Sequence, residues 1–331
     1  MAATTNAARL RTTNYELLKM KTAFLFPGQG AQVVGMGADI GAAFTQAADI
    51  FKKANDILGF DLSEICFNGP ADRLNSTEIS QPAIFTVSAA ILEVVKTVPG
   101  TAKIRPDVTA GLSLGEYTAL YAAGVIDFES ALLLCHQRGK AMQKAADASD
   151  GGMLSIIGLD DEKVQQLCAR AAEGEVLGAV NFNCPGQIVV SGTTAACRRA
   201  EQLAVEYGAL KAVPLQVAGA FHTDFMSPAA EQLRIALAKC SIRDPGDIRV
   251  IANIDGHYYT SAADIAEGLI KQLTNPVLWQ KCMQTLLDDG VEVFYEVGPG
   301  RVLTGLMKRI SRKTQVINVS TLDPLNALLN P

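Results

Sequence analysis

The 331-residue sequence lacks the features that mark several large classes of protein. No uninterrupted apolar run approaches the roughly 20 residues that a membrane-spanning helix needs. Lysine and arginine (29) are outnumbered by aspartate and glutamate (34), so the basic excess typical of nucleic-acid-binding proteins is missing. With 49% hydrophobic and 19% charged residues, the composition is that of an ordinary globular chain. We therefore expect a folded protein that binds neither nucleic acid nor a membrane.

Cysteine is present, but not in the spacings that bind zinc or build a disulfide framework. The number is odd, and no C-x-x-C pair occurs among the seven: Cys66, Cys135, Cys168, Cys184, Cys197, Cys240 and Cys282. This pattern predicts a reducing compartment and no metal site. We expect a cytoplasmic location, with a plastid or mitochondrion as the alternative if residues 1–20 are a transit remnant.

Those first 20 residues are small, hydroxylated and basic, with no acidic residue before Glu16. An expression leader, a transit remnant and a native, disordered extension all have this composition. We leave this segment out of the fold prediction.

The most informative stretch that is present is an apolar strand running through Gly111-Leu-Ser113-Leu-Gly115 into a helix-forming segment. This is the layout of a nucleophile elbow, in which a sharp turn lifts a serine hydroxyl clear of the backbone and small neighbours make room for it. Ser113 is the predicted nucleophile for acyl chemistry. The amide of Leu114, at the start of the helix, is placed to donate to the forming oxyanion.

A serine nucleophile needs a base, and the chain has only three histidines. His136 lies in a helical pattern, where we expect it to contact its neighbours, and His257 lies in a predicted turn open to solvent. His222 follows a run of small residues, Ala218-Gly-Ala-Phe, which allows its ring to approach another element closely. We predict His222 as the general base.

Two other residues are candidates for binding the reacting group. Gln29 lies between Gly28 and Gly30 after a predicted strand, in a spacing that does not fit the G-x-G-x-x-G dinucleotide motif. Such a loop exposes a backbone amide toward a reacting carbonyl. Arg138 lies within a helical pattern, where arginine is ordinarily a surface charge. If it faces the serine, it would pair with a carboxylate and select acyl groups that carry a free acid.

A basic cluster lies near the C-terminus and consists of Lys308, Arg309, Arg312 and Lys313. A solvated helix face is the ordinary interpretation of such a run, and a docking site for an acidic partner is the alternative.

The hydrophobic pattern predicts an α/β fold. Strands are expected at 22–26, 108–110, 248–252 and 293–297, and helices at 44–58, 81–97 and 131–146. This alternation is typical of a mainly parallel sheet covered by helices on both faces. Between 151 and 215 the order becomes strand, helix, strand, strand, helix, strand, which is the ferredoxin-like arrangement. We interpret that segment as a small domain inserted into a larger one.

Five motifs occur in one order along residues 21–312: Phe26-Pro-Gly-Gln-Gly30, Gly111-Leu-Ser-Leu-Gly-Glu-Tyr117, Gln137-Arg-Gly-Lys140 with Met142, Gly219-Ala-Phe-His222 and Glu296-Val-Gly-Pro-Gly300. Together they resemble the malonyl-CoA:acyl carrier protein transacylases, the acyltransferases of fatty-acid and polyketide synthesis. The resemblance implies an α/β-hydrolase-like large domain over 21–148 and 217–315. It places a ferredoxin-like small domain at 149–216 and a tail at 316–331.

The resemblance also implies roles for the candidate residues. Ser113 would be the acylated nucleophile and His222 its base. Arg138 would clamp the malonyl carboxylate, and Gln29 and Leu114 would form the oxyanion hole.

Further roles are implied by the resemblance alone. A main-chain carbonyl would orient the histidine, and the matching position is Gln272, so substitution of that side chain is expected to do little. Asn183 would line the cleft from the small domain, and Phe221 would crowd the α-methyl group of methylmalonyl-CoA. Many members of the family have histidine just before the serine, whereas this chain has Leu112. Some other members also have leucine there.

These roles describe a ping-pong transfer of a malonyl group from malonyl-CoA to acyl carrier protein by a monomer without a cofactor. The basic cluster at Lys308–Lys313 would dock the acidic carrier. Fatty-acid synthesis is the expected pathway and polyketide synthesis the alternative. A thioesterase-like serine hydrolase and a noncatalytic carrier-binding module remain as rival functions.

Overall fold

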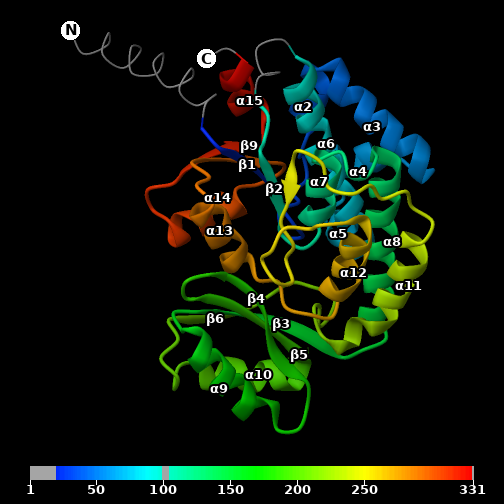
Figure 1. Ribbon diagram of the computed structural model, residues 1–331. Helices are drawn as coiled ribbons and strands as arrows, with labels where there is room; N and C mark the ends of the chain where they lie inside the picture. The colour runs from blue at the N-terminus through cyan, green and yellow to red at the C-terminus, as the bar shows by residue number, and fades with distance from the viewer. Residues whose placement is uncertain (1–19, 99–103, 330–331) are drawn as a thin grey trace.

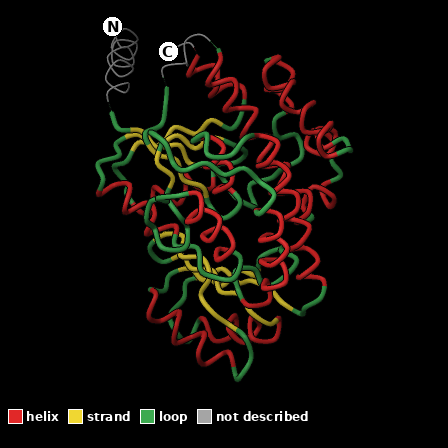
Figure 2. Tube along the Cα trace, turned by 45° about the vertical axis from the view of Figure 1, so that its right-hand side comes forward, coloured by secondary structure: helices red, strands yellow, loops and turns green. Residues whose placement is uncertain are grey.

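The computed structural model describes residues 20–98 and 104–329, so all but the last residue of the predicted leader lies outside the described residues. The described chain forms two sheets with helices packed against them (Figure 1). Figure 2 shows the strands in two separate groups, one above the other, with helices around each group.

The first sheet is parallel throughout. Its order is β7 (Arg249–Val250), β2 (Val108–Gly111), β1 (Thr22–Phe26), β8 (Val293–Val297) and β9 (Gln315–Val319). The three central strands are buried along their whole length, as the near-continuous apolar runs of a sheet covered on both faces require.

Alternate residues of β1 enter two different cores. Phe24 and Phe26 pack with α6 (Thr77–Thr97), α7 (Gly115–Ala122) and α8 (Phe128–Asp147), whereas Ala23 and Leu25 pack with α13 (Trp279–Asp288) and α14 (Val302–Ile310). The remaining helices of this region are α2 (Ala38–Ala43), α3 (Thr45–Leu58), α4 (Leu62–Asn68), α5 (Ala71–Asn75), η1 (Asp224–Met226), α11 (Ser227–Leu237), α12 (Ala262–Gln272) and α15 (Leu322–Leu329). The predicted mixed α/β fold with a mainly parallel sheet is confirmed.

Helix α6 has the length and composition of a membrane-spanning helix, but 89% of its most apolar window is buried inside the protein. Its hydropathy therefore reflects a place at the centre of the core. The helix begins four residues before the predicted start, because Pro82 is accommodated inside it and does not mark its first turn.

The second sheet is antiparallel, in the order β4 (Leu177–Cys184), β5 (Gln187–Thr193), β3 (Gly151–Ile157) and β6 (Lys211–Pro214). Helices α9 (Asp161–Ala172) and α10 (Thr194–Ala204) bury one face of it in a separate core. The elements follow one another in the predicted order of strand, helix, strand, strand, helix, strand.

The antiparallel sheet is tied to the rest of the chain by backbone pairing. The amide of Phe182 on β4 donates to the carbonyl of Val277 at 3.0 Å, and the Val277 amide donates to the carbonyl of Val180 at 2.8 Å. Arg309 on α14 adds hydrogen bonds to the Gln187 side chain and to the Pro185 carbonyl at 2.9 and 3.1 Å. These contacts fix the distance between the two sheets.

The C-terminal residues differ from the prediction of a tail beyond residue 315. Gln315–Val319 form strand β9, which pairs with β8 at the edge of the parallel sheet, and Leu325 of α15 is fully buried. Four of the five strand residues are half-buried or exposed, so their hydrophobic signal is weak. The predicted strand at 248–252 is shortened to Arg249–Val250.

Candidate active site

Ser113 lies on a tight turn between β2 and α7 and has a φ of 52°, a left-handed backbone conformation that is rare for serine. The two flanking glycines leave room for this turn. A Cβ on Gly111 would lie 1.9 Å from the Gly115 carbonyl carbon, and one on Gly115 would lie 2.1 Å from the Phe26 oxygen. Neither position accepts a side chain, so the glycines of the motif are there for close approach of the backbone.

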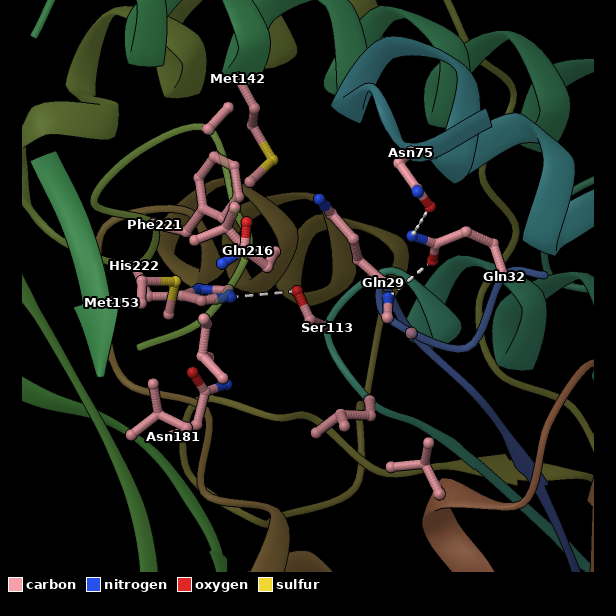
Figure 3. Close-up of a pocket in the computed structure, with 18 of the residues that line it drawn as sticks. Gln29, Gln32, Asn75, Ser113, Met142, Met153, Asn181, Gln216, Phe221 and His222 are labelled. Atoms are coloured by element: carbon pink, nitrogen blue, oxygen red, sulfur yellow. Dashed lines mark hydrogen bonds between the residues drawn. The ribbon is translucent and has the colours of Figure 1, made fainter. Parts of the chain in front are cut away.

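His222 reaches the serine from a turn 109 residues further along the chain. Its Nε2 lies 3.1 Å from Ser113 Oγ (Figure 3). Its Nδ1 lies 2.7 Å from the main-chain oxygen of Gln272 at the end of α12. A carbonyl only accepts hydrogen bonds, so Nδ1 carries the proton and Nε2 is left free to accept one from the serine.

Burial and the nearby positive charge of Arg138 lower the pKa of His222 to about 4. The imidazole is therefore neutral at neutral pH, the state in which a general base must start. His222 also has a positive φ, of 61°, so both members of the pair occupy strained backbone conformations.

Arg138 comes from α8 and is almost fully buried, with 1% of its surface exposed. Its Nη2 donates to Ser113 Oγ and to Gln272 Oε1, each at 2.9 Å, and its Nη1 donates to Gln81 Oε1 at 2.7 Å. Within the described ranges it forms no ion pair with an acidic side chain. A buried guanidinium without an anion beside it is ready to take a carboxylate from a ligand.

Residues that the sequence did not single out complete the site. The side chain of Asn253, three residues after β7, accepts from the Ser113 amide at 2.7 Å and donates to the Gly111 carbonyl at 2.8 Å. Gln81 on α6 holds Arg138. Asn253 is 140 residues from the serine, and only the pairing of β7 with β2 brings it to the turn.

The side chain of Gln272 corrects the expectation that only its main chain matters. It is fully buried, accepts from Arg138, and its Nε2 donates to the Ser113 carbonyl at 3.0 Å. Substituting it would remove contacts to two of the three candidate catalytic groups.

Ser113 and His222 open into a cavity of about 900 Å³ between the two sheets (Figure 3). Its walls come from both: Gln29, Ser113 and Phe221 from the parallel-sheet region, and Met153, Asn183 and Val189 from the antiparallel sheet. This volume suits a ligand much larger than a malonyl group, such as a thioester with its pantetheine arm.

The two candidate oxyanion groups lie on adjoining loops. Gln29 follows β1 and lines the cavity, and its side chain donates to Thr77 Oγ1 at 3.5 Å. Gln32 accepts from the Gly30 amide at 2.7 Å and holds this loop in place. Leu114 is fully buried, with its amide at the start of α7 directly after Ser113.

The other predicted residues are placed as follows. Phe221 and Asn183 line the cavity, and the buried Asn183 Oδ1 has no hydrogen-bond partner among the described residues. His136 packs against Phe60, and His257 is exposed beside Asp255, so neither belongs to the site.

All four residues of the basic cluster are exposed, two in the last turn of α14 and two just after it, and the first residue of this helix, Val302, lines the cavity. Arg309 is already engaged with the β4–β5 turn. In the part of the chain that the structure describes, no cluster of three or more His, Cys, Asp or Glu side chains could hold a metal ion.

Comparison with known proteins agrees with this geometry. Residues 23–326 match the family described as acyl transferase domain. The malonyl CoA-acyl carrier protein transacylase of Haemophilus influenzae is 45% identical over 308 residues, which are 93% of this chain and 98% of that protein.

Solved structures with the same fold include an acyl carrier protein S-malonyltransferase from Vibrio cholerae, with a TM-score of 0.88 and 43% identity over 93% of this chain and 99% of the other. A malonyl-transacylase solved in complex with its type II PKS acyl-carrier protein also has a TM-score of 0.88, with 40% identity and coverage of 93% and 99%. The chain therefore belongs to the acyl transferase domain family, among the malonyl CoA-acyl carrier protein transacylases.

Proposed function

We propose that the protein transfers a malonyl group from malonyl-CoA to the phosphopantetheine thiol of an acyl carrier protein through an ester on Ser113. The observation that carries this proposal is the position of Ser113 Oγ, which lies 3.1 Å from the neutral imidazole of His222 and 2.9 Å from the guanidinium of Arg138. One neighbour activates the hydroxyl, and the other recognises a carboxylate on the acyl group.

In the first half-reaction, Ser113 Oγ attacks the thioester carbonyl while His222 Nε2 takes its proton. The bond between the carbonyl carbon and sulfur then breaks, and the imidazolium returns the proton to the leaving CoA sulfur. The main-chain oxygen of Gln272 holds Nδ1–H throughout, as the carboxylate does in a serine triad. The second half-reaction repeats these steps with the carrier thiol as nucleophile, so no cofactor is needed.

The main-chain amides of Gln29 and Leu114 would stabilise the oxyanion of each tetrahedral intermediate. Arg138 would exchange its hydrogen bond to Ser113 Oγ for the malonyl carboxylate, which frees the hydroxyl for attack. Phe221 and Asn183 would shape the acyl end of the cavity, with Phe221 disfavouring a methylmalonyl group.

We further propose that the parallel-sheet region, over 21–148 and from 217 onward, is an α/β-hydrolase-like domain. The antiparallel sheet, within 149–216, would be a ferredoxin-like insert. The strand order of each sheet supports this division. All seven cysteines are free thiols, which fits a reducing, cytoplasmic location, and we propose a monomer.

The carrier protein is proposed to dock on the exposed basic cluster, since α14 runs from the cavity wall to Lys308, and Arg312 follows two residues after the helix ends. Fatty-acid synthesis is the proposed pathway, and the similarity to a polyketide malonyl-transacylase keeps polyketide synthesis as the alternative. Replacing Lys308 and Arg312 with glutamate should raise the carrier KM without changing acylation by malonyl-CoA. Arg309 should be left intact because it holds the β4–β5 turn.

The direct test supplies purified protein with malonyl-CoA and the phosphopantetheinylated carrier, and measures malonyl-carrier formation and free malonate together. Transfer is expected to exceed hydrolysis and to vanish in Ser113→Ala. Hydrolysis that outpaces transfer would favour the serine hydrolase, and a wild-type protein that never becomes acylated would favour the noncatalytic module.

A further inference from the structure

Behind the candidate site lies a carboxylate that the proposed mechanism does not use. Glu116, on the first turn of α7, is fully buried. It accepts hydrogen bonds from the Tyr259 hydroxyl, from Gln272 Nε2 at 2.5 Å and from the Asn253 amide at 3.4 Å. Burial raises the pKa of Glu116 to about 7, so keeping this acid in the core is costly at neutral pH. Such a cost suggests a role other than stability.

The hydrogen-bond polarity around Gln272 shows what that role is. The nitrogen of its side-chain amide donates to two acceptors, the Glu116 carboxylate and the Ser113 carbonyl. The oxygen of the same amide accepts from the guanidinium of Arg138, which can only donate. A guanidinium only donates and a carbonyl only accepts, so Oε1 of Gln272 faces Arg138 and its NH2 faces the Ser113 carbonyl and Glu116. Glu116 is the side-chain acceptor that anchors the NH2 end of Gln272 in the orientation that holds the arginine.

The same arrangement keeps the arginine available for substrate. The Gln272 amide lies between Glu116 and Arg138. The two charged groups interact electrostatically but form no direct ion pair. A carboxylate in direct contact would compete with the substrate for the guanidinium. One placed behind an amide supports the buried charge and leaves the side that faces Ser113 Oγ free of a competing anion.

We propose that Glu116 is a positioning residue that acts through the side chain of Gln272 to hold Arg138 for the malonyl carboxylate. It thereby sets the preference for acyl groups that carry a free acid. This inference rests on the proposed malonyl transfer.

A second buried glutamate provides a matched control. Glu296 on β8 is also fully buried, but its carboxylate accepts from the Leu303 and Thr304 amides, each at 2.9 Å, at the start of α14. It contacts neither Gln272 nor Arg138. Replacing it tests what loss of any buried carboxylate does to the protein.

The experiment compares the rate of Ser113 acylation by malonyl-CoA and by acetyl-CoA in Glu116→Gln, Gln272→Leu, the double variant and Glu296→Gln. Glu116→Gln should raise the malonyl-CoA KM about tenfold, a size typical of a misplaced binding group, and leave acetyl-CoA within about twofold. Gln272→Leu should cost at least as much. Because Glu116 acts through Gln272, the double variant should be no worse than Gln272→Leu alone. Glu296→Gln should leave the ratio of malonyl to acetyl rates unchanged.

An unchanged ratio in Glu116→Gln, or losses that multiply in the double variant, would overturn the inference while wild-type malonylation stands. Absence of wild-type acylation would instead defeat the proposed function. If Glu116→Gln does not fold, Tyr259→Phe removes one partner of the carboxylate and should shift the same ratio in the same direction by a smaller factor.

Discussion

The two sheets contribute different things to one cavity. Gln29, Ser113 and Asn253 lie within three residues of the ends of β1, β2 and β7, at the carboxyl ends of parallel strands, where such sheets bind their ligands. The antiparallel sheet supplies Met153, Asn181, Asn183 and Val189 to the wall, and none of these bonds to Ser113, His222 or Arg138. Reacting groups come from one region, and the other shapes the space around the substrate.

Backbone strain follows the same division. Within residues 20–98 and 104–329, the only non-glycine residues with positive φ are Ser113, His222 and Glu173. Glu173 lies at the C-cap of α9, where a left-handed residue ordinarily ends a helix. The other two are the predicted nucleophile and base, so the strain in the parallel-sheet region is concentrated where the chemistry is proposed to occur.

The largest effect expected in the parallel-sheet region is that of His222→Ala. Removing the base should lower the acylation rate by about 10³-fold for malonyl-CoA and acetyl-CoA alike, because the base acts on the serine and not on the acyl group. Rapid-quench measurement of the acyl-enzyme checks this. His257→Ala, at an exposed position outside the site, should match the wild type.

Arg138→Ala should separate the two substrates. Malonyl-CoA acylation should fall about 100-fold through loss of a charged hydrogen-bond partner, whereas acetyl-CoA acylation should fall only a few-fold. Rates with both substrates on one preparation provide the measurement. Equal losses would mean that Arg138 supports the fold or the serine and does not recognise the carboxylate.

The pH profile tests the buried environment of His222. With a folded pKa of about 4, the base stays neutral as pH falls and is lost only as pH passes through that value. At pH 5 about 90% of the enzyme should keep a neutral imidazole, against about 3% for an unperturbed histidine. The kcat/KM of acylation by acetyl-CoA should therefore be nearly flat from pH 8 to 5. A midpoint near 6.5 would contradict the environment described for His222.

The smallest of these effects belongs to the antiparallel sheet. Asn183→Ala should raise KM a few-fold and leave kcat nearly unchanged, since this residue lines the wall without touching the reacting groups. Gln166→Ala, on the exposed face of α9, is the control. A loss of kcat as large as that of His222→Ala would erase the distinction between the two regions.

Sequence reasoning reached the residues whose chemistry is local. The elbow around Ser113 is recognisable from its glycines, and His222 from the scarcity of histidine and its small neighbours. The structure brings both together with Arg138. Gln81, Asn253 and Glu116 were missed because their partners depend on which strands and helices are neighbours. A buried Gln, Asn or Glu has no sequence pattern that distinguishes it from a surface residue.

Dependence on distant neighbours also explains why the predicted fold lacks the last strand. Strand β9 is half exposed and has little alternation, and only its pairing with β8 defines it. For Gln272 the resemblance implies only a main-chain role, and its three side-chain contacts appear only in the folded chain.

Intact-mass measurement after exposure to malonyl-CoA, followed by peptide mapping, tests the central claim most directly. The wild type should gain the mass of one malonyl group, located on the peptide that contains Ser113, and should lose it when the carrier thiol is added. An adduct on another residue, or one that persists in Ser113→Ala, would contradict the account.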